Sequence, residues 1–187
     1  MRQPQQTFTL AEVARRLEVP QHRLIHLCEK RVVVPDVQDA GGRGSSRIFS
    51  ARNVLELAVA LQLRDMMLPV SATGAIVRVM RAFEDRLRDE LAEFSLATSL
   101  SDPDAPDLRV IISDGHRIFF SLGHGTRAPK LFGGVSIEEL SNDGWAPSGI
   151  GIVDGQATGT AFGGPEGSNF ARSEISLTAI AKALPIA

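Results

Sequence analysis

The apolar positions near the start of the chain repeat with the period of an α-helix. From Leu10 to Leu17 they are spaced by three and four residues, which places them on one helical face. Thr9 and Glu12 stand where a capping box would start this helix. The pattern therefore predicts a first amphipathic helix that is interrupted at Pro20.

A second short helix is expected from about Pro20 to Lys30, because proline suits the first helical turn, where its missing N–H costs nothing. One side of this helix is apolar and carries Leu24, Ile25, Leu27 and Cys28. The other side is polar and carries His22, Arg23, His26, Glu29 and Lys30. Two short helices of this kind are typical of a helix-turn-helix, although an ordinary helical hairpin with a solvated face has the same pattern.

A hairpin and a third helix are expected next. The β-type run from Val32 to Pro35 precedes a Gly-rich loop, residues 39–47, and then Ile48-Phe49. A strand, a loop and a second strand predict a hairpin, and a hairpin that follows a helix-turn-helix would form a wing. The alternative is a surface loop whose arginines have no such role. Ser50 can cap the third helix. The residues of this helix expected to face inward are Leu55, Ala58, Val59 and Leu63.

This order of helix, turn, helix, hairpin and helix resembles the MerR family of winged-helix regulators. The matching stretch covers about residues 8–83 and includes FTLAEVARRLEVPQHRL, VVVP and GRGSSRIFSARNVLELAVALQLRDMMLPVSATGAI. The resemblance implies a homodimer that binds a palindromic or pseudo-palindromic promoter site on double-stranded DNA. Excisionases and other small phage or plasmid proteins share the same winged helix.

The resemblance also implies which residues meet DNA. The first helix would lie near the DNA backbone, the second in the major groove, and the wing arginines at phosphates or in the minor groove. The candidate DNA-binding residues are Arg15, Arg16, Gln21, His22, Arg23, His26, Lys30, Arg43, Ser45, Ser46, Arg47 and Arg52.

A long helix from Ser71 to about Thr98 is expected to connect the two halves and to pair subunits. Its apolar residues have the spacing of a coiled-coil seam. The candidate dimerisation residues are Ile76, Met80, Phe83, Leu87, Leu91 and Phe94. MerR-like proteins dimerise through a helix in this place, but an amphipathic helix that packs on its own domain is the alternative.

The β-type runs and turns in residues 108–187 predict a small antiparallel α+β domain. Asp114-Gly115 is a hairpin turn between two β-type runs. The strand candidates are Leu108 to Ser113, Arg117 to Leu122, Leu131 to Val135, Gly149 to Val153, Gln156 to Phe162 and Arg172 to Leu177. A short helix is expected from Ser136 and a closing helix from Thr178 to Leu184.

The distribution of charge changes the picture given by the net charge of −2. Residues 1–82 hold 12 Lys+Arg against 7 Asp+Glu, whereas residues 83–107 hold 2 against 8. The neutral total therefore hides a basic first segment that suits a nucleic acid. The expected division is 1–70, an all-α winged helix-turn-helix; 71–98, an amphipathic connecting helix; 99–107, a linker; and 108–187, the α+β domain.

Other chemistry finds little support in the sequence. No nucleophile, base or pair of carboxylates stands at a spacing that is typical of a catalytic site, so we expect no enzyme and no cofactor. The single cysteine, Cys28, is expected to be a core residue and not a sensor thiol. His116 and His124 share strand parity, but we expect no metal site there. Trp145 is expected to cap the sheet, and the Gly163–Ser168 segment is expected to be a plain loop. No apolar run is long enough to span a membrane, which favours a cytoplasmic protein.

The sequence therefore predicts a homodimeric, sequence-specific regulator of transcription. A DNA-architectural, recombination or replication accessory protein of a mobile element remains an alternative, and so does a protein-interaction module that binds no DNA. For the C-terminal half, the resemblance leaves open the binding of a small-molecule effector or added contacts between subunits.

Overall fold

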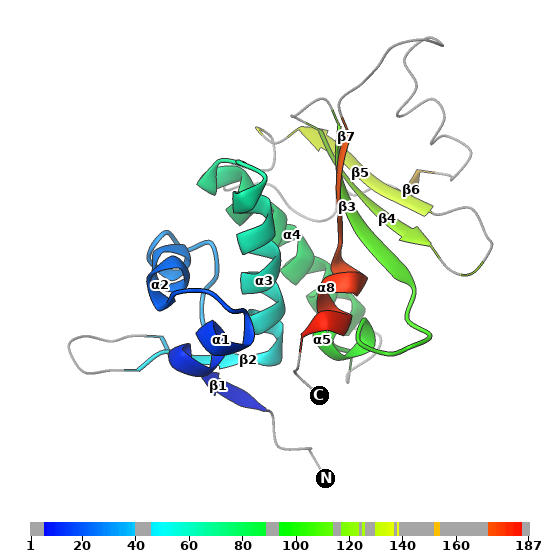
Figure 1. Ribbon diagram of the computed structural model, residues 1–187. Helices are drawn as coiled ribbons and strands as arrows, with labels where there is room; N and C mark the ends of the chain where they lie inside the picture. The colour runs from blue at the N-terminus through cyan, green and yellow to red at the C-terminus, as the bar shows by residue number, and fades with distance from the viewer. Residues whose placement is uncertain are drawn as a thin grey trace.

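The chain folds into a helical N-terminal half followed by a small antiparallel sheet (Figure 1). This computed structural model describes residues 6–39, 46–88, 94–113, 117–123, 125, 130–136, 138, 152–153 and 172–184. The mixed α+β layout predicted from the sequence is confirmed. No helix within these ranges has the length and apolar character needed to cross a bilayer.

The first two helices are short and form as the apolar spacing predicts. Helix α1 covers Leu10–Arg16 and begins with the expected capping box between Thr9 and Glu12. Helix α2 covers Gln21–Glu29 and buries Leu24, Leu27 and Cys28. Strand β1, Thr7–Thr9, pairs antiparallel with β2, Ile48–Ser50. On its other side, Ile48 of β2 forms an isolated bridge with Gln38.

The strand expected from Val32 to Pro35 does not form, and this prediction is wrong. Val32 and Val33 are buried core residues in a bend that follows α2. The carbonyl of Val34 accepts hydrogen bonds from the side chains of Asn53 and Arg81 at 3.1 and 3.2 Å, and not from a neighbouring strand. The segment reaches the hairpin only at Gln38.

Helix α3, Ala51–Asp65, is the central element of the fold. Ser50 caps it as expected, in a capping box that is completed by Asn53. The predicted inward residues Leu55, Ala58, Val59 and Leu63 are buried, but so is every other residue from Asn53 to Leu61. Helices α4, α5 and α8 all contact α3, which explains why more than one of its faces is covered.

The long helix expected from Ser71 to Thr98 is divided. Helix α4 covers Val70–Arg88, Phe94 and Ser95 are not helical, and α5 covers Leu96–Ser99. Ile76 and Met80, predicted to pair subunits, are 0% and 2% exposed within the chain's own core.

Those two residues therefore have no surface to offer a second subunit, and the predicted seam is wrong for them. Phe83 and Phe94 pack half-buried against the same core. The side chain of Leu87 and the whole of Leu91 lie outside the described residues.

The C-terminal sheet has the order β6-β5-β4-β3-β7, with every described pair antiparallel. The strands are β3, Asp107–Ser113; β4, Arg117–Gly123; β5, Lys130–Ser136; β6, Ile152–Val153; and β7, Arg172–Ser176. These agree with five of the six expected strands. The expected turn at Asp114-Gly115, the strand from Gln156 to Phe162 and most of the short helix after Ser136 lie outside the described residues.

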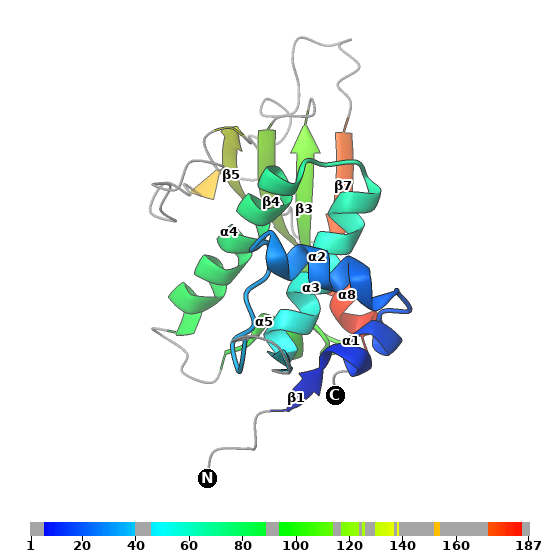
Figure 2. The ribbon, with the colours of Figure 1, turned by 90° about the vertical axis from the view of Figure 1, so that its left-hand side faces the viewer.

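One hydrophobic core joins the two halves. Helix α8, Leu177–Ala183, confirms the expected closing helix and contacts both β3 and α3. Leu108, Val110 and Ile112 of β3 belong to the same core cluster as the buried residues of α2 and α3. In Figure 2, α2 lies toward the viewer, α3 lies behind it, and the sheet lies at the back.

Candidate nucleic-acid interface

The outer face of α2 is the most exposed polar surface on the sequence-predicted helix pair. Leu24 and Leu27 attach the helix to the core at 0% and 2% exposure. Three predicted DNA contacts on the opposite side are exposed, His22, His26 and Lys30, and Gln21 is exposed at the start of the helix. The helix lies on the side of α3 away from the five-stranded sheet, so the sheet does not obstruct this face (Figures 1 and 2).

The two arginines at the end of α1 differ in their environment. Arg15 is exposed, as a phosphate contact would need to be. Arg16 is partly buried, and its guanidinium carbon lies 4.7 Å from the centre of the Phe8 ring. This cation–π contact fixes Arg16 against β1, so much of the side chain serves the packing of the fold.

Arg23 is held by an ion pair with the far end of α3. Its Nη2 lies 2.5 Å from Oδ1 of Asp65. The side chains remain 37% and 63% exposed, so this is a surface pair. Arg23 therefore lies on the flank of α2 that faces α3 and not on the outermost face with His22 and His26.

The hairpin that follows α2 is closed by backbone hydrogen bonds in both directions between Gln38 and Ile48, at 3.2 and 2.9 Å. Beyond this bridge, Arg47 Nε pairs with Asp39 Oδ1 at 3.2 Å. Ser46 is exposed, and its carbonyl accepts from the Gln38 side chain at 3.1 Å. Arg43 and Ser45, the other two predicted contacts of the wing, lie outside the described residues.

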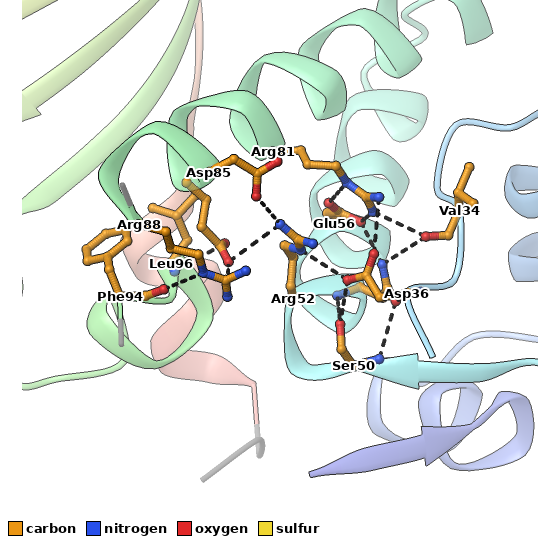
Figure 3. A network of polar contacts seen from close by, with 12 residues as sticks. Val34, Asp36, Ser50, Arg52, Glu56, Arg81, Asp85, Arg88, Phe94 and Leu96 are labelled. Atoms are coloured by element: carbon orange, nitrogen blue, oxygen red, sulfur yellow. Dashed lines mark hydrogen bonds and ion pairs between the residues drawn. The ribbon is translucent and has the colours of Figure 1, made fainter. Parts of the chain in front are cut away.

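Arg52 was predicted to contact DNA, but its partners are carboxylates of its own chain (Figure 3). Its Nε lies 3.0 Å from Asp36 Oδ2, and its Nη1 lies 2.7 Å from Asp85 Oδ1. The side chain is only 17% exposed. Arg52 therefore joins the start of α3 to α4 and to the segment before the hairpin, which is a structural role.

A second arginine, Arg81 of α4, completes this network. It donates to Glu56 through Nε at 2.8 Å and through Nη2 at 2.6 Å, and its Nη1 lies 3.1 Å from Asp36. Asn53 Nδ2 also donates to Glu56, at 2.9 Å. Burial raises the pKa of Glu56, and the hydrogen bonds and charge of Arg81 offset this only in part.

The pKa of Asp36 moves in the opposite direction. Burial works to raise it, but hydrogen bonds from Arg52 and Ser50 and the charge of Arg81 outweigh burial and lower it. Ser50 Oγ donates to Asp36 at 2.9 Å, and the Asp36 N–H donates to Asn53 Oδ1 at 2.7 Å. These bonds fix the chain just before the hairpin to the start of α3.

The end of α4 is tied to α5 by a second set of polar contacts. Glu84, 1% exposed, accepts from the Leu96 N–H at 3.2 Å and pairs with Arg88 at 2.7 Å. Arg88 Nε donates to the carbonyl of Phe94 at 2.7 Å. Burial raises the pKa of Glu84 against the opposing charges of Arg88 and Arg52. The position of α5 therefore depends on the end of α4.

Cys28 and the possible metal ligands are the remaining candidates for chemistry. Cys28 is buried, which confirms it as a core residue, and burial raises its pKa to about 11. Among the described residues, no group of three or more His, Cys, Asp or Glu side chains could hold a metal ion. His116, His124, Trp145 and the Gly163–Ser168 loop lie outside the described residues.

Sequence reasoning missed several residues that shape this surface. Glu29 is exposed on the same side of α2 as His22 and His26, as the helical spacing predicted, but it was not among the candidate DNA contacts. The carboxylates that hold two of the arginines were also missed: Asp65 lies 42 positions from Arg23, and Asp39 lies eight positions from Arg47 in the same hairpin. No protein-family model matches the chain, and no curated protein is found to be similar to it.

Proposed function

We propose that the chain is a sequence-specific DNA-binding regulator of transcription, in which α1, α2 and the hairpin act as a winged helix-turn-helix. The observation that carries the proposal is the exposed polar face of α2, with His22, His26 and Lys30 directed away from the core. The resemblance of residues 8–83 to MerR-like regulators supports the same function.

The dimensions of α2 suit the major groove. An α-helix with its side chains is about 10–12 Å across, and the major groove of B-DNA is about 12 Å wide, so a helix such as α2 can lie in the groove. The three buried residues of its inner face pack α2 against the core, so its outer face is presented to solvent and to the groove. Histidine, glutamine and lysine side chains can contact base edges and phosphates there.

The proposal includes the homodimer that the resemblance implies. A dimer would place two α2 helices on two half-sites about one helical turn apart, and the two-fold symmetry of the protein would match that of the DNA. The pairing surface cannot include Ile76 and Met80 of the predicted seam, because both are enclosed within the chain.

The test is binding of the full chain to a random-sequence DNA duplex library, followed by anisotropy titrations on the selected sequence and on a scrambled one. We expect His26→Ala to reduce the preference for the selected sequence by about fivefold or more, which corresponds to one good base contact. Lys30→Ala should weaken binding to both sequences alike and reduce the salt slope by about 0.9.

Lys182→Ala is the matched control, because Lys182 is exposed on α8 and lies outside the proposed interface. It removes one positive charge and should leave both affinities nearly unchanged. If all three variants bind every sequence as the unmodified chain does, α2 does not read DNA and the proposal fails.

A further inference from the structure

Two histidines stand four residues apart on the exposed face of α2. Side chains at positions i and i+4 of a helix are neighbours, with Cβ atoms about 5–6 Å apart. His22 and His26 are both exposed, and α2 is fixed on the core by Leu24 and Leu27. The backbone therefore holds the two imidazoles side by side on a rigid support.

This spacing is suited to chelation of a metal ion. Two imidazole nitrogens one helical turn apart can bind one ion at about 2.0–2.1 Å each, as the paired histidines of helical zinc sites do. Imidazole favours zinc, nickel and copper, whereas magnesium and calcium require oxygen ligands. Glu29 is exposed on the same side of α2, but no group of three such ligands is assembled among the described residues.

We propose that His22 and His26 together bind one divalent transition-metal ion, with water in the remaining coordination positions. The ion belongs to the class that prefers imidazole, represented by Zn²⁺. Where the chain acts on DNA, which rests on the function proposed above, an occupied site withdraws both imidazoles from the base edges. The metal therefore reduces the ability of α2 to distinguish DNA sequences.

The first experiment is a calorimetric titration of the untagged full-length chain with Zn²⁺ in a buffer that does not chelate metals. We expect one ion per chain. His22→Ala and His26→Ala should each weaken binding by at least about tenfold, because a single imidazole then replaces a linked pair. Mg²⁺ should give no binding at this site.

Two controls identify the pair. The chain has four histidines, so His116→Ala combined with His124→Ala should leave this Zn²⁺ affinity unchanged. Glu29→Ala should change the affinity much less than either α2 histidine variant. If His22→Ala and His26→Ala retain full affinity, or if one ion is shared by two chains, the intrachain site is refuted.

The second experiment separates the metal site from the DNA function. Affinities for the selected and scrambled duplexes are compared with Zn²⁺ and with a chelator, and we expect Zn²⁺ to lower their ratio by about fivefold or more. An unchanged ratio overturns the effect on DNA reading. A chain that binds Zn²⁺ through both histidines but never binds DNA refutes the proposed function and keeps the metal site.

Discussion

The outer face of α2 and the contacts between α3 and α4 use similar polar residues in opposite ways. On α2, His22, His26 and Lys30 face solvent. Between α3 and α4, Arg52 and Arg81 each meet more than one carboxylate, and their side chains are only 17% and 27% exposed. The first arrangement leaves its polar groups available to a ligand, whereas the second uses them to join parts of the chain.

This difference shows why a count of basic residues overstates a candidate DNA-binding surface. Residues 1–82 carry 12 Lys+Arg, but Arg23, Arg47, Arg52 and Arg81 all have carboxylate partners within the chain. The energetic consequences also differ between the two regions. An exposed ion pair contributes about 0–1 kcal/mol to stability, whereas removal of one partner from a buried pair costs about 3–5 kcal/mol.

The largest expected effect comes from removal of the C-terminal half. A chain that ends at Asp107 lacks Leu177, Ile180 and Ala181 of α8, which pack in the same core as α3. Helix α3 would then expose apolar residues to water, so we expect residues 1–107 to lose the cooperative unfolding transition of the full chain. Circular dichroism during urea denaturation measures this. A cooperative transition near the midpoint of the full chain would instead show that the N-terminal half is an independent domain.

The next effect tests the buried side of the comparison. Glu56→Ala leaves the guanidinium of Arg81 without its principal carboxylate partner, and we expect a loss of about 3–5 kcal/mol in the free energy of unfolding. Glu29→Ala, on the exposed face of α2, should change it by less than about 0.5 kcal/mol. Urea denaturation of both variants provides the comparison, and equal losses would remove the distinction between the two regions.

A smaller effect is expected at Asp36, whose side chain is 20% exposed. Asp36→Asn replaces the carboxylate that faces the arginines with a neutral amide. We expect it to lower the free energy of unfolding by about 1.5–3 kcal/mol near pH 7. Because the folded state lowers the pKa of Asp36, its contribution is complete above the ordinary value of 3.8 and disappears as the pH falls through the folded pKa.

The difference between Asp36→Asn and the unmodified chain should therefore shrink below about pH 4. Glu56 and Glu84 have raised pKa values, so protonation of these two groups favours the folded state as the pH falls. Both are present in the two proteins compared, so only the part of the Glu56 shift that comes from the charge of Asp36 itself adds to the difference. Urea midpoints measured from pH 7 to pH 3 test this, and a constant difference would contradict it.

Local patterns predicted much of the helical half. The capping residues Thr9 and Ser50 and the apolar spacing of α1 and α2 are local features, and they placed these elements within about a residue. Three helices end without the glycine that commonly marks such an end: Glu18, Arg31 and Met67 adopt left-handed φ values of 53°, 54° and 65°. In each case a hydrogen bond from the residue that follows stabilises the turn, as in a Schellman motif.

The interface was only partly predictable. Exposure of His22 and His26 follows from the helical period, but the pairing of Arg23 with Asp65 joins residues 42 positions apart. Likewise, the apolar spacing of Ile76 and Met80 fits a seam between subunits and a core position equally well. Only the packing of α4 on α3 decides between these, and that is a property of the whole fold.

The smallest effect on stability is expected at the pair that joins α2 to the end of α3, Arg23 and Asp65. Asp65→Asn removes a surface charge partner, so we expect a change of less than about 1 kcal/mol in the free energy of unfolding. The effect on DNA should be easier to measure. Arg23 is already 37% exposed, and without Asp65 its guanidinium becomes available to a phosphate.

One additional phosphate contact per chain should make the slope of log affinity against log salt steeper by about 0.9. Anisotropy titrations over a range of salt concentrations would measure this. Asp104→Asn is a suitable control, because it removes an exposed acidic charge from the turn after α5. The two variants have the same net charge, so an equal change in both slopes would point to the overall field of the protein. A change confined to Asp65→Asn would show that the ion pair, and not the number of charges, decides whether Arg23 is available to DNA.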